Sequence, residues 1–385
     1  MGIYSDYLNT LKTFDVITRE RKAQLRRISE IRKKDIIVIA SAIGKPNSSI
    51  DYSDIIPIAD QVDSLNGDKL DVILETPGGS GEIAEELVRH LRRRHAELNF
   101  IVPGTAKSAG TIMVMAGDEI LMGSLSSLGP IDAQLARDGK QFSAEAFLRG
   151  IEEIKKESDS TQSLNRAYIP ILQGISPGEI EAAKNALKFG KDLARKWLEE
   201  FKFKHWTTHS SSGLPVTPEE RKVKAGKIAE ELGTHGKWLS HSRSLRIEDL
   251  EKMGLLITNF ELQQELADAI RRYHTLLRMS FDINIVKIYE TPTSQIYRFL
   301  NQPAPPPQVP QGRVDKVDIN FACQNPDCRK MTIIEASFTG KLQVTPPKVP
   351  FPKNNKFTCP HCGAEADLTT LRMQLEAQTK RSLVL

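Results

Sequence analysis

The sequence has no cysteine before residue 323, no long apolar run and no clear excess of one charge. A disulfide framework therefore cannot support its larger N-terminal part. No stretch reaches the roughly 18 apolar residues that a membrane-spanning helix needs, and the start lacks the basic-then-apolar pattern of a secretion signal. The 53 Lys and Arg against 49 Asp and Glu give a net charge of +4, which indicates neither nucleic acid nor an acidic membrane as a partner. We expect a soluble, unsecreted, cytoplasmic protein.

Short apolar runs without alternation recur along the first third of the chain, separated by helix-like stretches. Strands of this kind are typical of a parallel sheet that is buried on both faces. The sequence therefore predicts an α/β fold, with strands at Ile36–Ala40, Leu70–Leu74, Phe100–Val102 and Ile120–Met122.

Composition divides the remaining chain. Consecutive prolines in Gln302–Pro310 favour extended backbone, so we place a linker there. Basic residues crowd Arg19–Lys34, which reads as a solvated helix face or as a docking helix for an acidic partner or phospholipid headgroups. We predict a basic helical segment at 1–34, a main domain at 35–300 with a helical insertion at about 144–203, a proline-rich linker at 301–312 and a C-terminal domain at 313–385.

Two glycine-containing turns resemble the halves of one acyl-transfer site. Leu74–Ser80 reads Leu-Glu-Thr-Pro-Gly-Gly-Ser, and Gly104–Gly110 reads Gly-Thr-Ala-Lys-Ser-Ala-Gly. Each follows a predicted strand and precedes a helical pattern, so both should emerge at the same edge of the sheet. A glycine pair can point a backbone N–H at a developing oxyanion, and Ser108 at a helix start is a candidate nucleophile. Small residues at a helix start also permit close packing of helix on sheet.

These motifs resemble the serine peptidases of the Clp protease and signal peptide peptidase clan. The resemblance covers roughly Asp35 to Thr258 and implies a Clp/crotonase-like core. It also implies that the amides of Gly79 and Ala109 form an oxyanion hole around Ser108. Relatives in the clan form rings or other oligomers, so a homo-oligomer acting on peptide or protein substrates is expected. No Gly-x-Gly-x-x-Gly follows a predicted strand, so no nicotinamide cofactor is implied.

The base is the point at which the chain departs from the Clp pattern. Asp132 stands where Clp-type peptidases place a histidine, and a carboxylate is too weak a base to deprotonate serine at neutral pH. The serine dehydrogenase proteinase family, which the chain resembles here, has the order Ser, Asp, His. That resemblance implies that His241 is the base and that Asp132 orients it. His235 is the alternative base, and a dyad of Ser108 with Lys107 is a further option.

Four cysteines at the C-terminal end predict a metal site. Cys323-x4-Cys328 and Cys359-x2-Cys362 each present two sulfurs from one tight turn, as tetrahedral Zn²⁺ requires. A closed four-cysteine site is structural, and intervening strands at Met331–Ile334 and Leu342–Thr345 predict a zinc ribbon. We expect the ribbon to recruit a protein partner or substrate. Nucleic acid is not expected, because Arg329, Lys330 and Lys341 alone make no phosphate track.

Together these features favour a serine peptidase that is cytoplasmic and open to peripheral membrane contact through its basic N-terminal segment. Two other functions stay open at this stage. A crotonase-like acyl-CoA enzyme would share the core and the paired-amide oxyanion hole. A catalytically silent Clp-like scaffold would bind partners through its zinc ribbon.

Overall fold

The computed structural model describes residues 2–11, 13–137, 139–209, 212–300, 315–339, 344–379 and 381–384. The chain divides into two compact units, Met1–Leu300 and Asn301–Leu385. The predicted linker at 301–312 lies outside the described residues. Among the described helices, none has both the length and the apolar character that crossing a bilayer requires.

A seven-stranded sheet forms the centre of the first unit, in the order β11-β10-β1-β2-β3-β5-β9. Five of its strands are parallel neighbours: β1 (Asp35–Ser41), β2 (Lys69–Glu75), β3 (Glu97–Val102), β5 (Glu119–Met122) and β9 (Thr258–Asn259). The first four are the predicted parallel strands, and β9 was not predicted. The sheet is nevertheless mixed, because β10 (Ile285–Glu290) runs antiparallel to β1 and β11 (Gln295–Phe299) runs antiparallel to β10. The sequence reading did not identify these two strands.

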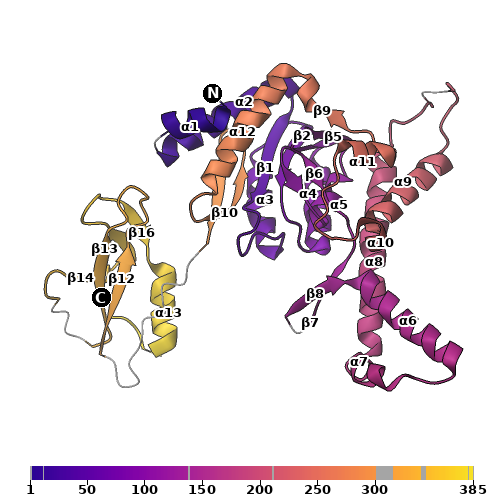
Figure 1. Ribbon diagram of the computed structural model, residues 1–385. Coiled ribbons are helices and arrows are strands. Elements are labelled where there is room, and N and C mark those ends of the chain that lie inside the picture. Colours follow the sequence, from indigo (N-terminus) through magenta and orange to yellow (C-terminus); the bar gives the residue numbers. More distant parts are fainter. Residues whose placement is uncertain are drawn as a thin grey trace. The chain divides into compact units, whose positions relative to one another are not determined.

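Helices cover both faces of this sheet (Figure 1). Alternate side chains of β1 separate into two cores: Ile37 and Ile39 face one, and Ile36 and Val38 face the other. The first core receives α3 (Ile55–Asp63), α4 (Gly81–Arg94) and α5 (Ala109–Val114), and the second receives α2 (Phe14–Arg32) and α12 (Gln264–Ser280). Burial on both faces explains why the strands read as continuous apolar runs.

The basic N-terminal segment contains α1 (Ile3–Thr10) and α2. Several of its cations are bound inside the unit rather than presented to solvent. Arg21 and Lys22 pair with the buried Glu290, and Arg32 pairs with Asp71. Arg27 and Lys34 also have carboxylate partners, in Asp268 and Glu97 respectively. Five cations of the basic run thus have carboxylate partners within the unit.

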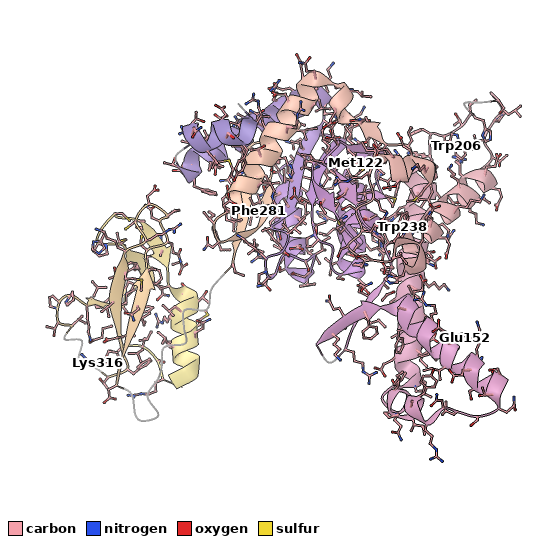
Figure 2. The ribbon with its side chains drawn as sticks, in the orientation of Figure 1. Met122, Glu152, Trp206, Trp238, Phe281 and Lys316 are labelled. Carbon is pink, nitrogen blue, oxygen red and sulfur yellow. The ribbon has the colours of Figure 1, made fainter. Side chains whose placement is uncertain are left out.

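A helical region follows the sheet strands and extends from them. In Figure 1, α6 (Ala144–Thr161) and α8 (Pro177–Trp197) run side by side away from the sheet, joined through α7 (Ile169–Gln173). The chain returns through η3 (Leu198–Lys202), α9 (Pro218–Gly233), α10 (His235–Trp238) and α11 (Ile247–Lys252). Trp238, labelled in Figure 2, is buried in the first core and donates its indole N–H to the Glu231 carbonyl at 2.8 Å. This contact anchors the short α10.

Three short pairings complete the first unit near the ends of the central strands. β4 (Thr105–Ala106) pairs with β6 (Ser127–Leu128), and β7 (Gln134–Arg137) forms a hairpin with β8 (Lys140–Ser143). Leu128 also forms an isolated antiparallel bridge with Leu245, in the loop that precedes α11. These pairings bring distant parts of the chain to one edge of the sheet.

The second unit is a small β structure with a terminal helix. Its three-stranded sheet has the order β12-β13-β14, and a separate hairpin carries the second cysteine pair. The predicted strand at Met331–Ile334 is part of β13. Of the strand predicted at Leu342–Thr345, the first two residues lie outside the described residues, and Val344 and Thr345 are not in a strand. The elements are β12 (Lys316–Ala322), β13 (Met331–Ser337), β14 (Val349–Pro350), β15 (Lys356–Thr358), β16 (Glu365–Asp367) and α13 (Thr369–Thr379).

Candidate active site and cysteine cluster

The first glycine-containing turn follows β2 and is fixed by a neighbouring loop. Gly78 and Gly79 have φ angles of 102° and 147°, which residues with a side chain rarely adopt. Ile50 donates its N–H to the Gly78 carbonyl at 2.7 Å and accepts from the Ser80 N–H at 2.9 Å. A Cβ on Gly79 would lie 2.3 Å from the Ile50 carbonyl oxygen. Glycine is therefore required there, and within the described residues the Gly79 N–H has no acceptor.

The second turn is hydrogen-bonded directly to the first. The Thr76 N–H donates to the Thr105 carbonyl at 2.9 Å, and the Lys107 N–H donates to the Thr76 carbonyl at 3.0 Å. Gly110 makes this approach possible, because a Cβ there would lie 2.4 Å from the Thr76 methyl carbon. The two turns predicted to share an edge of the sheet thus lie side by side.

Ser108 occupies the sharp bend between β4 and α5. Its φ of 49° and ψ of −117° place a non-glycine residue in a strained region of backbone space. A Cβ on Gly78 would lie 2.7 Å from the Ser108 Cβ, so glycine is also needed opposite the bend. In the described part of the chain, neither the Ser108 hydroxyl nor the Ala109 N–H makes a hydrogen bond. Both groups are available to a ligand.

Asp132 is a buried carboxylate that two histidines share. Asp132 is 1% exposed, and its Oδ1 lies 2.7 Å from the His241 Nδ1. Its Oδ2 lies 2.8 Å from the His235 Nδ1 and accepts from the Gln134 Nε2 at 2.9 Å. Burial acts to raise the pKa of Asp132, but the hydrogen bonds and charges of His241 and His235 outweigh it, so the pKa lies below its ordinary value.

One cavity of about 800 Å³ connects these groups. Ser108, Asp132 and His241 line it together with the oxyanion candidates Gly79 and Ala109. His235 is not among the described residues that line it. The cavity wall is otherwise mostly small or apolar, with contributions from Ile112, Ile131, Ala182, Ala186, Phe189 and Gly190. Of the two candidate histidines, only His241 therefore lines the same cavity as Ser108.

Lys107 is held away from the serine hydroxyl. Its Nζ donates to the carbonyls of Leu128 at 2.8 Å and Arg243 at 3.0 Å, and contacts the Ser244 hydroxyl at 3.1 Å. Burial, with a smaller effect of the Arg246 charge, lowers the pKa of Lys107 to about 8. Among the described contacts none joins Lys107 to Ser108. This geometry supports a structural tether to the loop of His241 rather than a Ser-Lys dyad.

Two of the residues that shape this site carry no sequence signal. Ile50 lies in a loop, and its bonds to Gly78 and Ser80 join segments distant along the chain, whereas Gln134 in β7 bonds the nearby Asp132. The position of Gln134 two residues after Asp132 could have been noted. Its hydrogen bond could not have been inferred from that spacing alone.

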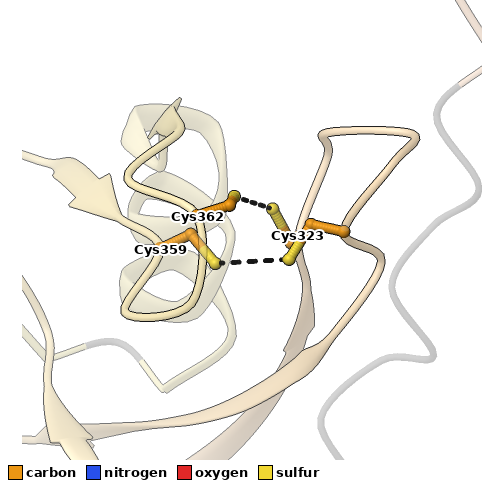
Figure 3. Close-up of side chains that lie close together, drawn as sticks. Cys323, Cys359 and Cys362 are labelled. Atoms are coloured by element: carbon orange, nitrogen blue, oxygen red, sulfur yellow. Dashed lines mark hydrogen bonds between the residues drawn. The ribbon is translucent and has the colours of Figure 1, made fainter.

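The four cysteines converge in the second unit. Their sulfur atoms all lie within 4.8 Å of one another, with Cys323 and Cys362 at 3.5 Å and Cys328 and Cys359 at 3.9 Å. Figure 3 shows the sulfurs facing one another from two loops. Four thiolates at this spacing fit a tetrahedral metal ion. His361 lies in the second knuckle but is exposed and outside this group.

Comparison with known proteins gives a consistent assignment for the first unit. The family model described as ClpP-like SDH-type serine proteinase matches residues 9–210, more than half of the chain. An uncharacterized protein of Methanocaldococcus jannaschii is 30% identical over 159 residues, covering 40% of this chain and 51% of that protein. A second from the same organism is 26% identical over 138 residues, covering 36% and 46%. The chain spans about half the length of these curated relatives.

Two solved structures of mutants of the 1510-N membrane-bound stomatin-specific protease are also similar. The first has a TM-score of 0.32 and 15% identity, and covers 57% of this chain and 79% of that one. The second, in complex with a substrate peptide, has a TM-score of 0.30 and 17% identity, and covers 56% and 70%. At these TM-scores the two structures carry no argument about this chain.

Proposed function

Because the chain belongs to the family of ClpP-like SDH-type serine proteinases, we propose that it is a serine peptidase acting through an acyl-enzyme intermediate. The observation that carries this proposal is the arrangement in one cavity of Ser108, two amides that have no acceptor among the described residues, and His241 bonded to a buried aspartate. A nucleophile, a base, an orienting group and oxyanion donors are the parts that acyl transfer requires.

In the proposed reaction the Ser108 Oγ forms a bond to the substrate carbonyl carbon while its proton passes to the His241 Nε2. The N–H groups of Gly79 and Ala109 donate to the carbonyl oxygen as it gains negative charge. The C–N bond then breaks, and His241 returns the proton to the leaving amine. Water then attacks the acyl carbon while giving a proton to His241. The bond from that carbon to the Ser108 Oγ breaks, and His241 returns the proton to Oγ, which releases the acid and restores Ser108.

The carboxylate of Asp132 orients His241 in this scheme. Since an ionised carboxylate only accepts hydrogen bonds, the 2.7 Å contact fixes the proton of His241 on Nδ1 and leaves Nε2 as the basic nitrogen. Asp132 also stabilises the imidazolium that forms. In the part of the chain that the structure describes, no hydrogen bond joins Ser108 to His241, which is consistent with this role because such bonds often form only when substrate is bound.

A fluorophosphonate probe tests the proposal, since it reacts with activated serines. The wild type should label, while Ser108→Ala and His241→Ala should not. Absence of Ser108-dependent labelling would refute the proposed peptidase activity, and would favour the crotonase-like or scaffold alternatives. Loss of labelling in His235→Ala, with His241→Ala still reactive, would transfer the base to His235.

For the second unit we propose that Cys323, Cys328, Cys359 and Cys362 hold one structural Zn²⁺. Support comes from the convergence of four sulfurs and from the small core of the unit, which a metal crosslink would stabilise. The closed thiolate set leaves no open position for water, so the metal would have no part in the reaction at Ser108. Recruitment of a protein partner by this ribbon, a homo-oligomer and a cytoplasmic location stay predictions.

A further inference from the structure

His235 has no part in the chemistry proposed above, although it lies on the same carboxylate as His241. Resting on that proposed function, we propose that His235 is a positioning residue: it holds Asp132 in the orientation that aligns His241. Two observations distinguish the roles of the two histidines. His241 lines the cavity with Ser108, whereas His235 bonds the carboxylate oxygen on the other side and does not line that cavity.

The backbone around His235 is built to hold this ring in place. The N–H groups of His235 and Gly236 donate to the two oxygens of Glu145, at 2.7 Å and 3.2 Å. The Leu239 N–H donates to the His235 carbonyl at 2.8 Å, and Trp238 of the same short helix is buried. Held on Asp132 in this way, His235 is not among the described residues that line the cavity of Ser108. A fixed donor, rather than a mobile base, fits the geometry.

The carboxylate itself explains why a second donor is needed. The Asp132 side chain has no exposed surface, so water cannot satisfy the oxygen that faces away from His241. A buried carboxylate oxygen without a hydrogen-bond donor costs free energy of folding, and nothing then fixes the rotation of the carboxylate plane. His235 and Gln134 both donate to that oxygen, at 2.8 Å and 2.9 Å. Together they fix the carboxylate plane, and with it the direction of the bond from Oδ1 to His241.

The two histidines therefore differ in what each must supply, and asparagine distinguishes them. The Nδ2 of asparagine takes nearly the place of a histidine Nδ1, so it keeps the hydrogen bond to Asp132 but offers no basic Nε2. A donor role survives His235→Asn, while a base role does not survive His241→Asn. His235→Phe retains a ring of similar size for packing and removes the donor.

The experiment measures the rate of fluorophosphonate labelling in the full-length chain. Losing a hydrogen bond to a buried charge should slow His235→Phe by about 10- to 100-fold. His235→Asn should stay within about threefold of wild type, and His241→Asn should be as unreactive as His241→Ala. His209→Asn is the matched control, since His209 bonds Glu220 at 3.1 Å outside the cavity and should leave the rate unchanged.

Each departure from this pattern is informative. Wild-type labelling in His235→Phe would overturn the positioning role, and so would a failure of His235→Asn to exceed His235→Phe. Reactive His241→Asn together with inert His235→Asn would make His235 the base. A wild type without Ser108-dependent labelling would refute the peptidase itself, before any question about His235 arises. Should His235→Phe fail to fold, Gln134→Leu removes the other donor and should also slow labelling.

Discussion

Replacing Ser108 by glycine should make the protein more stable than replacing it by alanine. Both changes remove the hydroxyl, and both should abolish labelling. Only glycine relieves the backbone, because the φ of 49° and ψ of −117° are unfavourable for any residue that carries a Cβ. Comparing the two variants therefore isolates the strain held at the nucleophile.

The size of the effect follows from two opposing contributions. A residue in such a sparsely populated region costs on the order of 1–3 kcal/mol, which glycine at position 108 would recover. Glycine also gives the unfolded chain more freedom, which costs about 0.5–1 kcal/mol. The net gain of Ser108→Gly over Ser108→Ala should then be about 1 kcal/mol. In a unit of this size that corresponds to a rise in Tm of about 2 °C.

Urea denaturation of the two variants, followed by tryptophan fluorescence, measures this difference at equal protein concentration. Parallel melts by circular dichroism give the change in Tm. Equal stability, or a less stable glycine variant, would contradict the argument that the serine is held in a strained bend. The result would then indicate that neighbouring contacts, rather than backbone conformation, decide which residue the position tolerates.

The remaining predictions concern the metal and the buried carboxylate. Purified protein should contain about one zinc ion per chain by elemental analysis. The zinc should be lost in Cys359→Ser but retained in the control His361→Ala, because His361 lies outside the sulfur cluster. Equal zinc content in both variants would refute the cluster as the site. The lowered pKa of Asp132 means that its ionised form stabilises the fold above its ordinary pKa of about 4, and that this contribution is lost as the pH falls through the lower native value. The stability advantage of wild type over Asp132→Asn should therefore narrow below about pH 4, and a gap that does not change with pH would contradict the assigned hydrogen bonds.

Local patterns were enough to locate the central strands. Each predicted run, such as Ile36–Ala40, falls inside an observed strand because burial on both faces leaves its mark on consecutive residues. Boundaries were less accurate: the strand predicted at Phe100–Val102 is the second half of β3, which begins at Glu97 and already pairs Leu98 with Leu70. The antiparallel β10 was missed because its place in the sheet depends on β1, more than 200 residues away in the sequence. Its neighbour β11 pairs with β10 across a short turn, but the sequence Gln-Ile-Tyr-Arg-Phe lacks the continuous apolar run of the predicted strands.

Some residues of the candidate site could likewise be identified from the sequence, whereas the roles of others could not. The glycine turns and Ser108 were visible because they need particular residues at particular backbone angles. The sequence offered His235 and His241 as competitors for one role, and nothing local could show that both bond Asp132. That arrangement depends on how α10 and the following loop pack against the strand ends. The basic run Arg19–Lys34 was ambiguous for the same reason, since its carboxylate partners lie far along the chain.

The side chain of Lys107 has a mechanical consequence for the cleft. Being next to the nucleophile in sequence, it reaches across to the backbone at Leu128 and Arg243, two residues from His241. The bend that carries the attacking oxygen and the loop that carries the imidazole are thereby crosslinked through one ammonium group. We therefore expect this ammonium group to restrict how far the attacking oxygen and the imidazole can move relative to one another.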